Sequence, residues 1–90
     1  MNIFIVSYDL NTDSSPHYDQ LVEAIKSYQD YICLGGSAYL IETDESSVSV
    51  RDNLKAFLNS GDKLYVGRVT SPAAWFGMPE GTSKWIKEHL

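Results

Sequence analysis

The chain has 90 residues, enough for one small domain, and its 43% hydrophobic and 21% charged residues are ordinary for a globular protein. No apolar run approaches the roughly 20 residues of a membrane helix. The opening segment 2–9 has no basic stretch before it, so a signal peptide is not expected. A single cysteine, Cys33, excludes an internal disulfide and a four-cysteine metal site. These features predict a cytoplasmic protein without a membrane partner.

The net charge of −5 is unevenly distributed along the chain. Residues 1–45 contain eight acidic residues and one basic residue, whereas residues 46–90 contain four acidic and six basic residues. Because nucleic-acid binding depends mostly on neutralising phosphates, this total disfavours it, and only a local basic patch in the second half would allow it. Two halves of different charge also suit a contact between two copies of the chain.

The first half of the chain predicts a strand, a helix and a hairpin. Residues 2–9 form a continuous apolar run typical of a central strand that is covered on both faces. Ser15 followed by Pro16 predicts a helix start. Gly35-Gly36 predicts a tight hairpin turn, since glycine readily adopts positive φ. We therefore expect strands near 2–9, 31–34 and 37–43 and a helix near 16–28.

The second half predicts a helix, a strand and a closing helix. Ser46 is the expected cap of a helix near 47–59, with Asp44 as the alternative cap, and a strand is expected near 63–69. After Pro72 an irregular, aromatic-rich stretch leads to a short helix that Thr82 or Ser83 would cap.

The order strand–helix–strand–strand–helix–strand predicts a ferredoxin-like α+β sandwich. The expected antiparallel sheet has the strand order 4-1-3-2, with both helices on one face. A doubly wound parallel sheet is the alternative, and the short Gly35-Gly36 connection disfavours it. We expect one domain over residues 1–90, with a core of 1–70 and a tail of 71–90. The tail, a second copy of the chain, or both would cover the other sheet face.

This topology predicts which polar residues share an edge of the sheet. Asp9, Ser37 and Asp62-Lys63 are expected to meet where the first strand ends. Asp30, Asp44 and Glu45 are expected at the opposite edge.

Two segments resemble the CRISPR-associated Cas-two family. Val6-Ser7-Tyr8-Asp9 is similar to the strand-ending tyrosine–aspartate of that family, and segment 36–42 is similar to its third-strand pattern. The tyrosine-rich stretch 28–31 also fits, and the resemblance covers roughly residues 1–70. A subgroup described as Cas-two-like or SinR-like looks closer still, because it shares the Ser-Tyr-Asp and a late tryptophan–glycine segment.

The resemblance implies a ferredoxin-like homodimer. It further implies metal-dependent phosphodiester hydrolysis in some members and a purely structural role in the spacer-integration complex in others. Asp9 matches the family's metal-linked aspartate, so it would be the catalytic and metal-binding residue of a magnesium-dependent nuclease acting on RNA or DNA. Alternatively, Asp9 simply caps the turn that follows it.

The remaining candidates have weaker signals. Ser37 and Asp62 would support Asp9, although an ordinary strand-start serine and turn chemistry explain these two residues better. Tyrosines at 8, 39 and 65 are expected in core and interface packing, with base stacking as the alternative. His89 is expected to be mobile near the terminus. The candidate nucleic-acid contacts are Arg51, Lys55, Lys63 and Arg68.

Two functions therefore stay open. The first is a Cas-two-like homodimeric nuclease that uses Asp9 and magnesium. The second is a non-enzymatic dimer that acts through protein contacts, which the absence of Lys and Arg in residues 11–19 favours.

Overall fold

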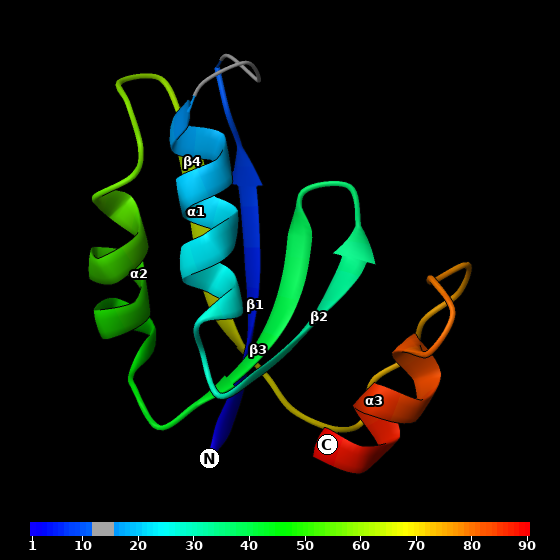
Figure 1. Cartoon of the computed structure of the whole chain (residues 1–90). Coiled ribbons are helices and arrows are strands. Elements are labelled where there is room, and N and C mark those ends of the chain that lie inside the picture. Colours follow the sequence, from blue (N-terminus) through cyan, green and yellow to red (C-terminus); the bar gives the residue numbers. More distant parts are fainter. Residues whose placement is uncertain (12–15) are drawn as a thin grey trace.

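The computed structural model describes residues 1–11 and 16–90, apart from the side chains of residues 16 and 17. The described residues form a small α+β protein with a four-stranded antiparallel sheet and three helices (Figure 1). The strands are β1 (Asn2–Asp9), β2 (Asp30–Gly35), β3 (Ala38–Thr43) and β4 (Lys63–Val69). The helices are α1 (Pro16–Lys26), α2 (Ser47–Lys55) and α3 (Thr82–His89).

The sheet has the strand order β2-β3-β1-β4, and each neighbouring pair is antiparallel. The neighbour relations are those of the expected order 4-1-3-2, and the parallel alternative is wrong. The continuous apolar sequence of β1 explains its central place, because both of its faces and both of its edges are used. The β2–β3 hairpin turns through Gly35 and Gly36, whose φ angles of 99° and 58° lie in the region that glycine tolerates.

The C-terminal ends of two helices depart from the sequence predictions. α1 ends at Lys26, two residues early, and α2 ends at Lys55 instead of residue 59. Beyond Lys55 the amides of Phe57 and Leu58 bond to carbonyls three residues back, so the chain tightens out of α geometry. The expected cap at Ser46 is confirmed, because its hydroxyl accepts from the Ser49 amide at 3.1 Å. The cap expected at Ser15 lies outside the described residues.

The cap expected for α3 is wrong. Gly81, with φ 88°, is the N-cap residue and provides no side-chain hydrogen bond. Thr82 is buried as the first helical residue, and the Ser83 hydroxyl accepts instead from Trp75 Nε1 at 2.8 Å. Ser83 therefore bonds to Trp75 and does not cap the helix as the sequence predicted.

α1 and α2 cover one face of the sheet, hereafter the helix-covered face (Figure 1). Its core is continuous from the sheet to both helices. The buried residues of this core are Phe4, Val6, Tyr8, Leu21, Ile25, Tyr39, Ile41, Val50 and Leu54.

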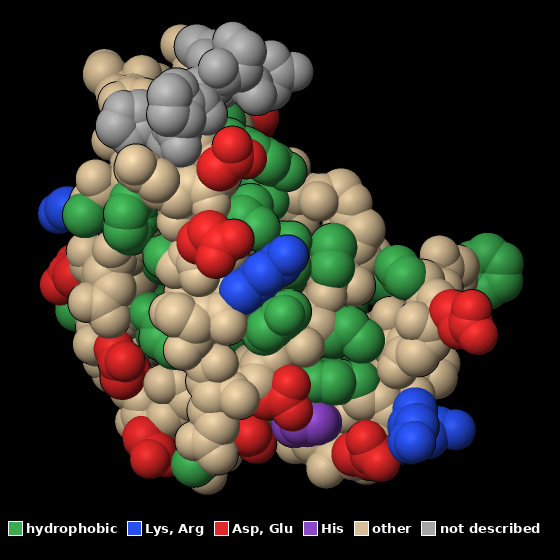
Figure 2. Space-filling view, in the orientation of Figure 1, with side chains coloured by type: hydrophobic (Ala, Val, Ile, Leu, Met, Phe, Trp, Pro, Cys, Tyr) green, Lys and Arg blue, Asp and Glu red, His purple; other side chains and the backbone are tan. Residues whose placement is uncertain are grey.

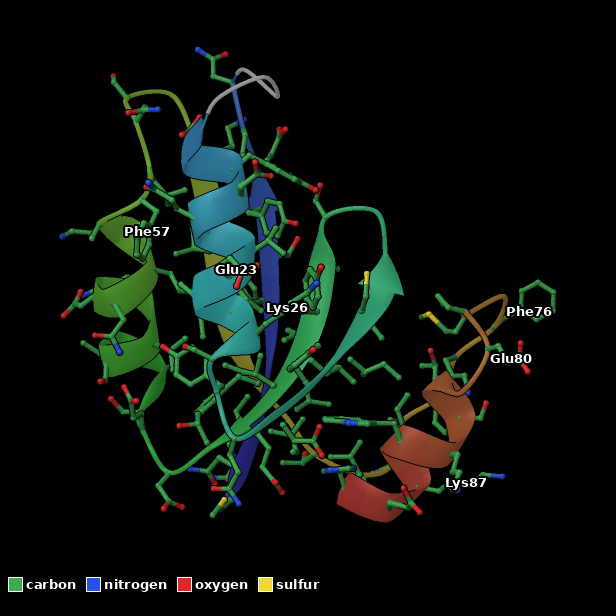
Figure 3. All side chains as sticks on the ribbon, in the orientation of Figure 1. Glu23, Lys26, Phe57, Phe76, Glu80 and Lys87 are labelled. Atoms are coloured by element: carbon green, nitrogen blue, oxygen red, sulfur yellow. The ribbon has the colours of Figure 1, made fainter. Side chains whose placement is uncertain are left out.

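α3 and the preceding segment cover part of the opposite face, hereafter the tail face. A smaller core forms there from Ile3, Leu40, Trp85 and Ile86, with Trp75 packed against it. The tail therefore packs on its own sheet, which is one of the two coverings expected from the sequence. Phe76 is the exception: it is 97% exposed and points away from the body of the molecule (Figure 3).

Candidate functional site

The edge at which β1 ends holds four of the predicted site residues, three of them with exposed side chains. Asp9 is the register partner of Lys63 on β4, and the Tyr8 amide donates to the Ser37 carbonyl at 3.0 Å. The side chains of Asp9, Ser37 and Lys63 are all exposed. The expected meeting of these residues at one edge is therefore observed. Asp9 lies on the tail face, because even numbers of positions separate it from Ile3, Ile5 and Ser7 along β1.

Asp62 lies at the same edge and ties two loops together. Its Oδ1 accepts from the Asn11 amide at 2.7 Å, and its Oδ2 accepts from the Asn59 amide at 2.7 Å. A carboxylate held by backbone amides on both oxygens acts as a loop clamp. This geometry favours the turn interpretation of Asp62 over a metal-ligating one.

The four candidate nucleic-acid contacts do not gather into one patch. Arg51 is hydrogen-bonded to its neighbour Asp52 on α2 through Nε at 3.0 Å and Nη2 at 2.9 Å. Lys63 and Arg68 lie an odd number of positions apart on β4, so their side chains leave opposite faces of the sheet. Lys55 is exposed at the end of α2. Figure 2 shows acidic side chains spread over one side of the molecule, with only a few separated basic ones.

The tyrosines separate into two groups. Tyr8 and Tyr39 are buried in the core of the helix-covered face, so their rings cannot stack on a base. Burial raises the pKa of each hydroxyl. Tyr65 is 65% exposed, and its ring lies over Gly67, where an added Cβ would meet the ring at 2.7 Å. The uncovered part of the tail face thus carries one exposed aromatic ring.

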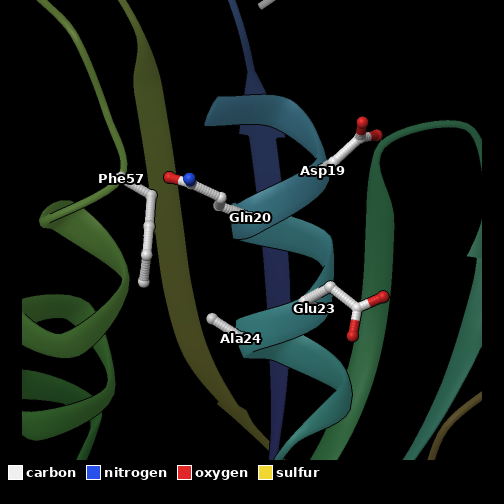
Figure 4. Close-up of a pocket in the computed structure, with 5 residues that line it drawn as sticks. All are labelled: Asp19, Gln20, Glu23, Ala24 and Phe57. Carbon is white, nitrogen blue, oxygen red and sulfur yellow. The ribbon is translucent and has the colours of Figure 1, made fainter. Parts of the chain in front are cut away.

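A hollow of about 450 Å³ lies between α1 and α2. Gln20 and Ala24 face Phe57 across it, whereas Asp19 and Glu23 point to the other side of α1 (Figure 4). The hollow therefore presents a small apolar wall without converging polar groups, and we assign no chemistry to it.

The opposite edge of the sheet holds a cluster that sequence reasoning missed. Asp30 and Glu42 are register partners on β2 and β3, and His89 reaches them from the end of α3. One ligand atom from each of the three side chains lies within 4.8 Å of the others. The expected mobility of His89 is wrong, because its Nδ1 is 2.7 Å from the Trp85 carbonyl and its Nε2 is 2.8 Å from Asp30 Oδ2.

The cluster shifts the titration of two of its members. Partial burial would raise the pKa of Asp30, but hydrogen bonds from Trp85 Nε1, the Tyr31 amide and His89 lower it below the usual value. Partial burial would lower the pKa of His89, but the Trp85 carbonyl and the two carboxylates raise it. The only early signal for this cluster was the placement of Asp30 at this edge. Nothing in the sequence pattern showed that α3 would bring His89 back to it.

No helix among the described residues is long and apolar enough to cross a membrane. No family model matches the chain, and no curated protein is significantly similar to it. Among solved structures, the chain is similar to a hypothetical protein, TT1823, from Thermus thermophilus. The two chains share 23% sequence identity and a TM-score of 0.67, over 86% of this chain and 92% of the other. This likeness shows a shared fold and assigns no activity.

Proposed function

We propose that this chain is a ferredoxin-like, Cas-two-like protein that works as a homodimer through the uncovered part of its tail face. The observation that carries the proposal is the exposed ring of Tyr65. It extends across Gly67, beside the half-buried Ile5, which lies at the margin of the smaller core on the tail face. An aromatic ring on a flat, partly apolar sheet surface is typical of the centre of a protein interface.

The charges beside Tyr65 fit a second copy of the same chain. Asp9 and Lys63 carry opposite charges, are register partners on β1 and β4, and are exposed on the same face. In a two-fold contact, each patch meets its own copy. Asp9 of one copy then faces Lys63 of the other, so the interface is self-complementary in charge as well as in apolar character.

Sedimentation of the full chain at micromolar concentration tests the dimer. We expect the wild type to sediment as a dimer and Tyr65→Asp to sediment as a monomer, because a carboxylate at the centre of the contact would be desolvated without a partner. Phe76→Asp is the matched control: it places the same charge on an exposed ring outside the patch and leaves the dimer intact. A monomeric wild type, or a dimer that survives Tyr65→Asp, contradicts the proposal.

Magnesium-dependent cleavage of RNA or DNA is the second candidate function, and the position of Asp9 favours it. Asp9 is an exposed carboxylate at the end of the central strand, on the face proposed for dimerisation. A two-fold contact whose axis passes beside Asp9, instead of one that pairs Asp9 with Lys63, would bring two Asp9 carboxylates together. Magnesium binds through few carboxylates and several waters, so such a pair would hold the ion and orient a water towards a phosphate.

A nuclease assay with and without magnesium distinguishes the two functions. If Asp9 is a ligand, wild type cleaves only with magnesium, Asp9→Asn abolishes cleavage, and Asp44→Asn, a matched change at the opposite edge, leaves it unchanged. No cleavage by the dimeric wild type supports the purely structural role. Magnesium-dependent cleavage that survives Asp9→Ala contradicts the role of Asp9 and moves the site elsewhere.

A further inference from the structure

The cluster of Asp30, Glu42 and His89 lies at the edge opposite Asp9, and three separate elements build it. Asp30 begins β2, Glu42 is near the end of β3 and His89 ends α3. The two carboxylates share one face because they are register partners. All three residues are partly buried, and because 44% of the Asp30 side chain is exposed, the cluster is open to solvent.

The imidazole of His89 is oriented by groups outside the cluster. Its Nδ1 lies 2.7 Å from the Trp85 carbonyl, which can only accept, so Nδ1 carries a proton. Its ring also stacks on Trp85, with centroids 3.8 Å apart and planes 10° from parallel. A backbone carbonyl that fixes Nδ1–H is the arrangement by which metal-binding histidines present Nε2 to a metal.

Asp30 is oriented in a similar way. Its Oδ1 accepts from the Tyr31 amide at 2.8 Å and from Trp85 Nε1 at 3.3 Å. Its Oδ2 is left to face Nε2 of His89 at 2.8 Å. Trp85 therefore positions both ligand residues, one through its carbonyl and the other through its indole.

The cluster carries a net negative charge, −2 with His89 neutral and −1 with His89 protonated, because it contains two carboxylates and one imidazole. Among the residues that the structure describes, no hydrogen-bond donor reaches the Glu42 carboxylate. The 2.8 Å separation of Nε2 and Oδ2 is that of a hydrogen bond, so Nε2 carries a proton in this arrangement. A metal ion at the site would take the place of that proton, which is released to solvent. A divalent metal ion would neutralise the cluster fully, whereas a proton does so only in part.

We propose that Asp30, Glu42 and His89 bind a divalent transition-metal ion, zinc in the first instance, which fastens α3 to the sheet. One imidazole nitrogen and two carboxylate oxygens are a ligand set that zinc accepts, and three protein ligands leave a fourth position for water. Zinc bonds of about 2.0–2.2 Å hold ligand atoms about 3.3 Å apart. When zinc binds, the 2.8 Å separation of His89 Nε2 and Asp30 Oδ2 would therefore widen slightly. The Glu42 carboxylate, which lies within 4.8 Å of both residues, would move closer to them.

Calorimetric titration of the full chain with zinc chloride, together with melting in zinc or in a chelator, tests this site. We expect one zinc ion per chain and a higher melting temperature in zinc, since a metal that binds the folded state alone stabilises it. Glu42→Gln keeps the contact between Asp30 and His89 but removes a ligand, so zinc affinity should fall at least tenfold. Glu88→Gln, an equal change of charge on an exposed neighbour of His89, should bind like the wild type.

Three results would overturn the proposal. The first is a wild type whose melting temperature zinc does not change, and the second is a Glu42→Gln variant that binds as tightly as Glu88→Gln. In both cases the cluster is an ion pair only. The third is loss of zinc binding in Asp9→Asn, which would place the metal at the opposite edge. The dimer assay tests Tyr65, and the nuclease assay tests magnesium at Asp9. A negative result in either assay is therefore distinguishable from a lack of zinc binding by Asp30, Glu42 and His89.

Discussion

The two faces of the sheet are closed by different means. The helix-covered face is sealed by two helices that come from within the strand–helix–strand units, and its core residues Val6, Leu21, Ile25 and Ile41 are fully buried. The tail face is covered by one late helix that reaches only part of it and is held by two tryptophans and a polar cluster. We therefore expect the helix-covered face to supply most of the stability, whereas the tail face carries the residues proposed to bind a second copy of the chain or a metal ion.

Ile41→Ala should have the largest effect on stability, because it opens a cavity in the core of the helix-covered face. Deleting a fully buried aliphatic side chain costs about 2–5 kcal/mol of the free energy of unfolding. Urea denaturation followed by circular dichroism measures the change. Val48→Ala, at a 53% exposed position on α2, is the control and should stay within about 0.5 kcal/mol of the wild type. Equal losses in the two variants would mean that this face is not the main core.

Trp85→Ala should have a smaller effect on global unfolding and a strong local one. The substitution removes the stacking partner of His89 and the indole donor to Asp30. The loss in the free energy of unfolding cannot exceed the free energy with which α3 docks on the sheet, because no further contact of Trp85 can be lost once α3 has undocked. Hydrogen exchange should therefore show loss of protection in α3 while β1 and α1 stay protected. Uniform loss of protection would instead make the tail an inseparable part of the core.

The same contrast explains what the sequence could predict. The strand order followed from local signals: a doubly apolar β1, a glycine hairpin and amphipathic helices, each of which constrains its own neighbours. The strand-ending Asp9 and the adjacent Lys63 and Ser37 were placed correctly, because topology alone brings strand ends together. These residues all belong to elements whose pairing is fixed by chain order.

The cluster at the opposite edge was not predictable in the same way. His89 meets Asp30 only because α3 folds back over the sheet, and that docking depends on Trp75 and Trp85 fitting a surface formed by β1, β2 and β3. No periodicity in residues 71–90 specifies that surface. The helix cap was missed for a related reason: Ser83 bonds to Trp75, a contact created by packing of the tail.

The smallest expected effect on stability comes from ionisation of Tyr8 at alkaline pH, and it tests how completely the core of the helix-covered face excludes water. Burial in the core of the helix-covered face raises the pKa of Tyr8 above its usual value of 10.0. Stability linked to this group is fully present below pH 10 and is lost as the pH rises through the higher folded-state pKa, because the unfolded chain releases its proton first. At pH 11 the loss from this one group should be about 1 kcal/mol. Urea midpoints between pH 8 and 11 should therefore fall less steeply in Tyr8→Phe than in the wild type. Val48→Ala, which removes no titrating group, should follow the wild-type slope, and identical slopes in all three proteins would show that Tyr8 is hydrated in the folded state.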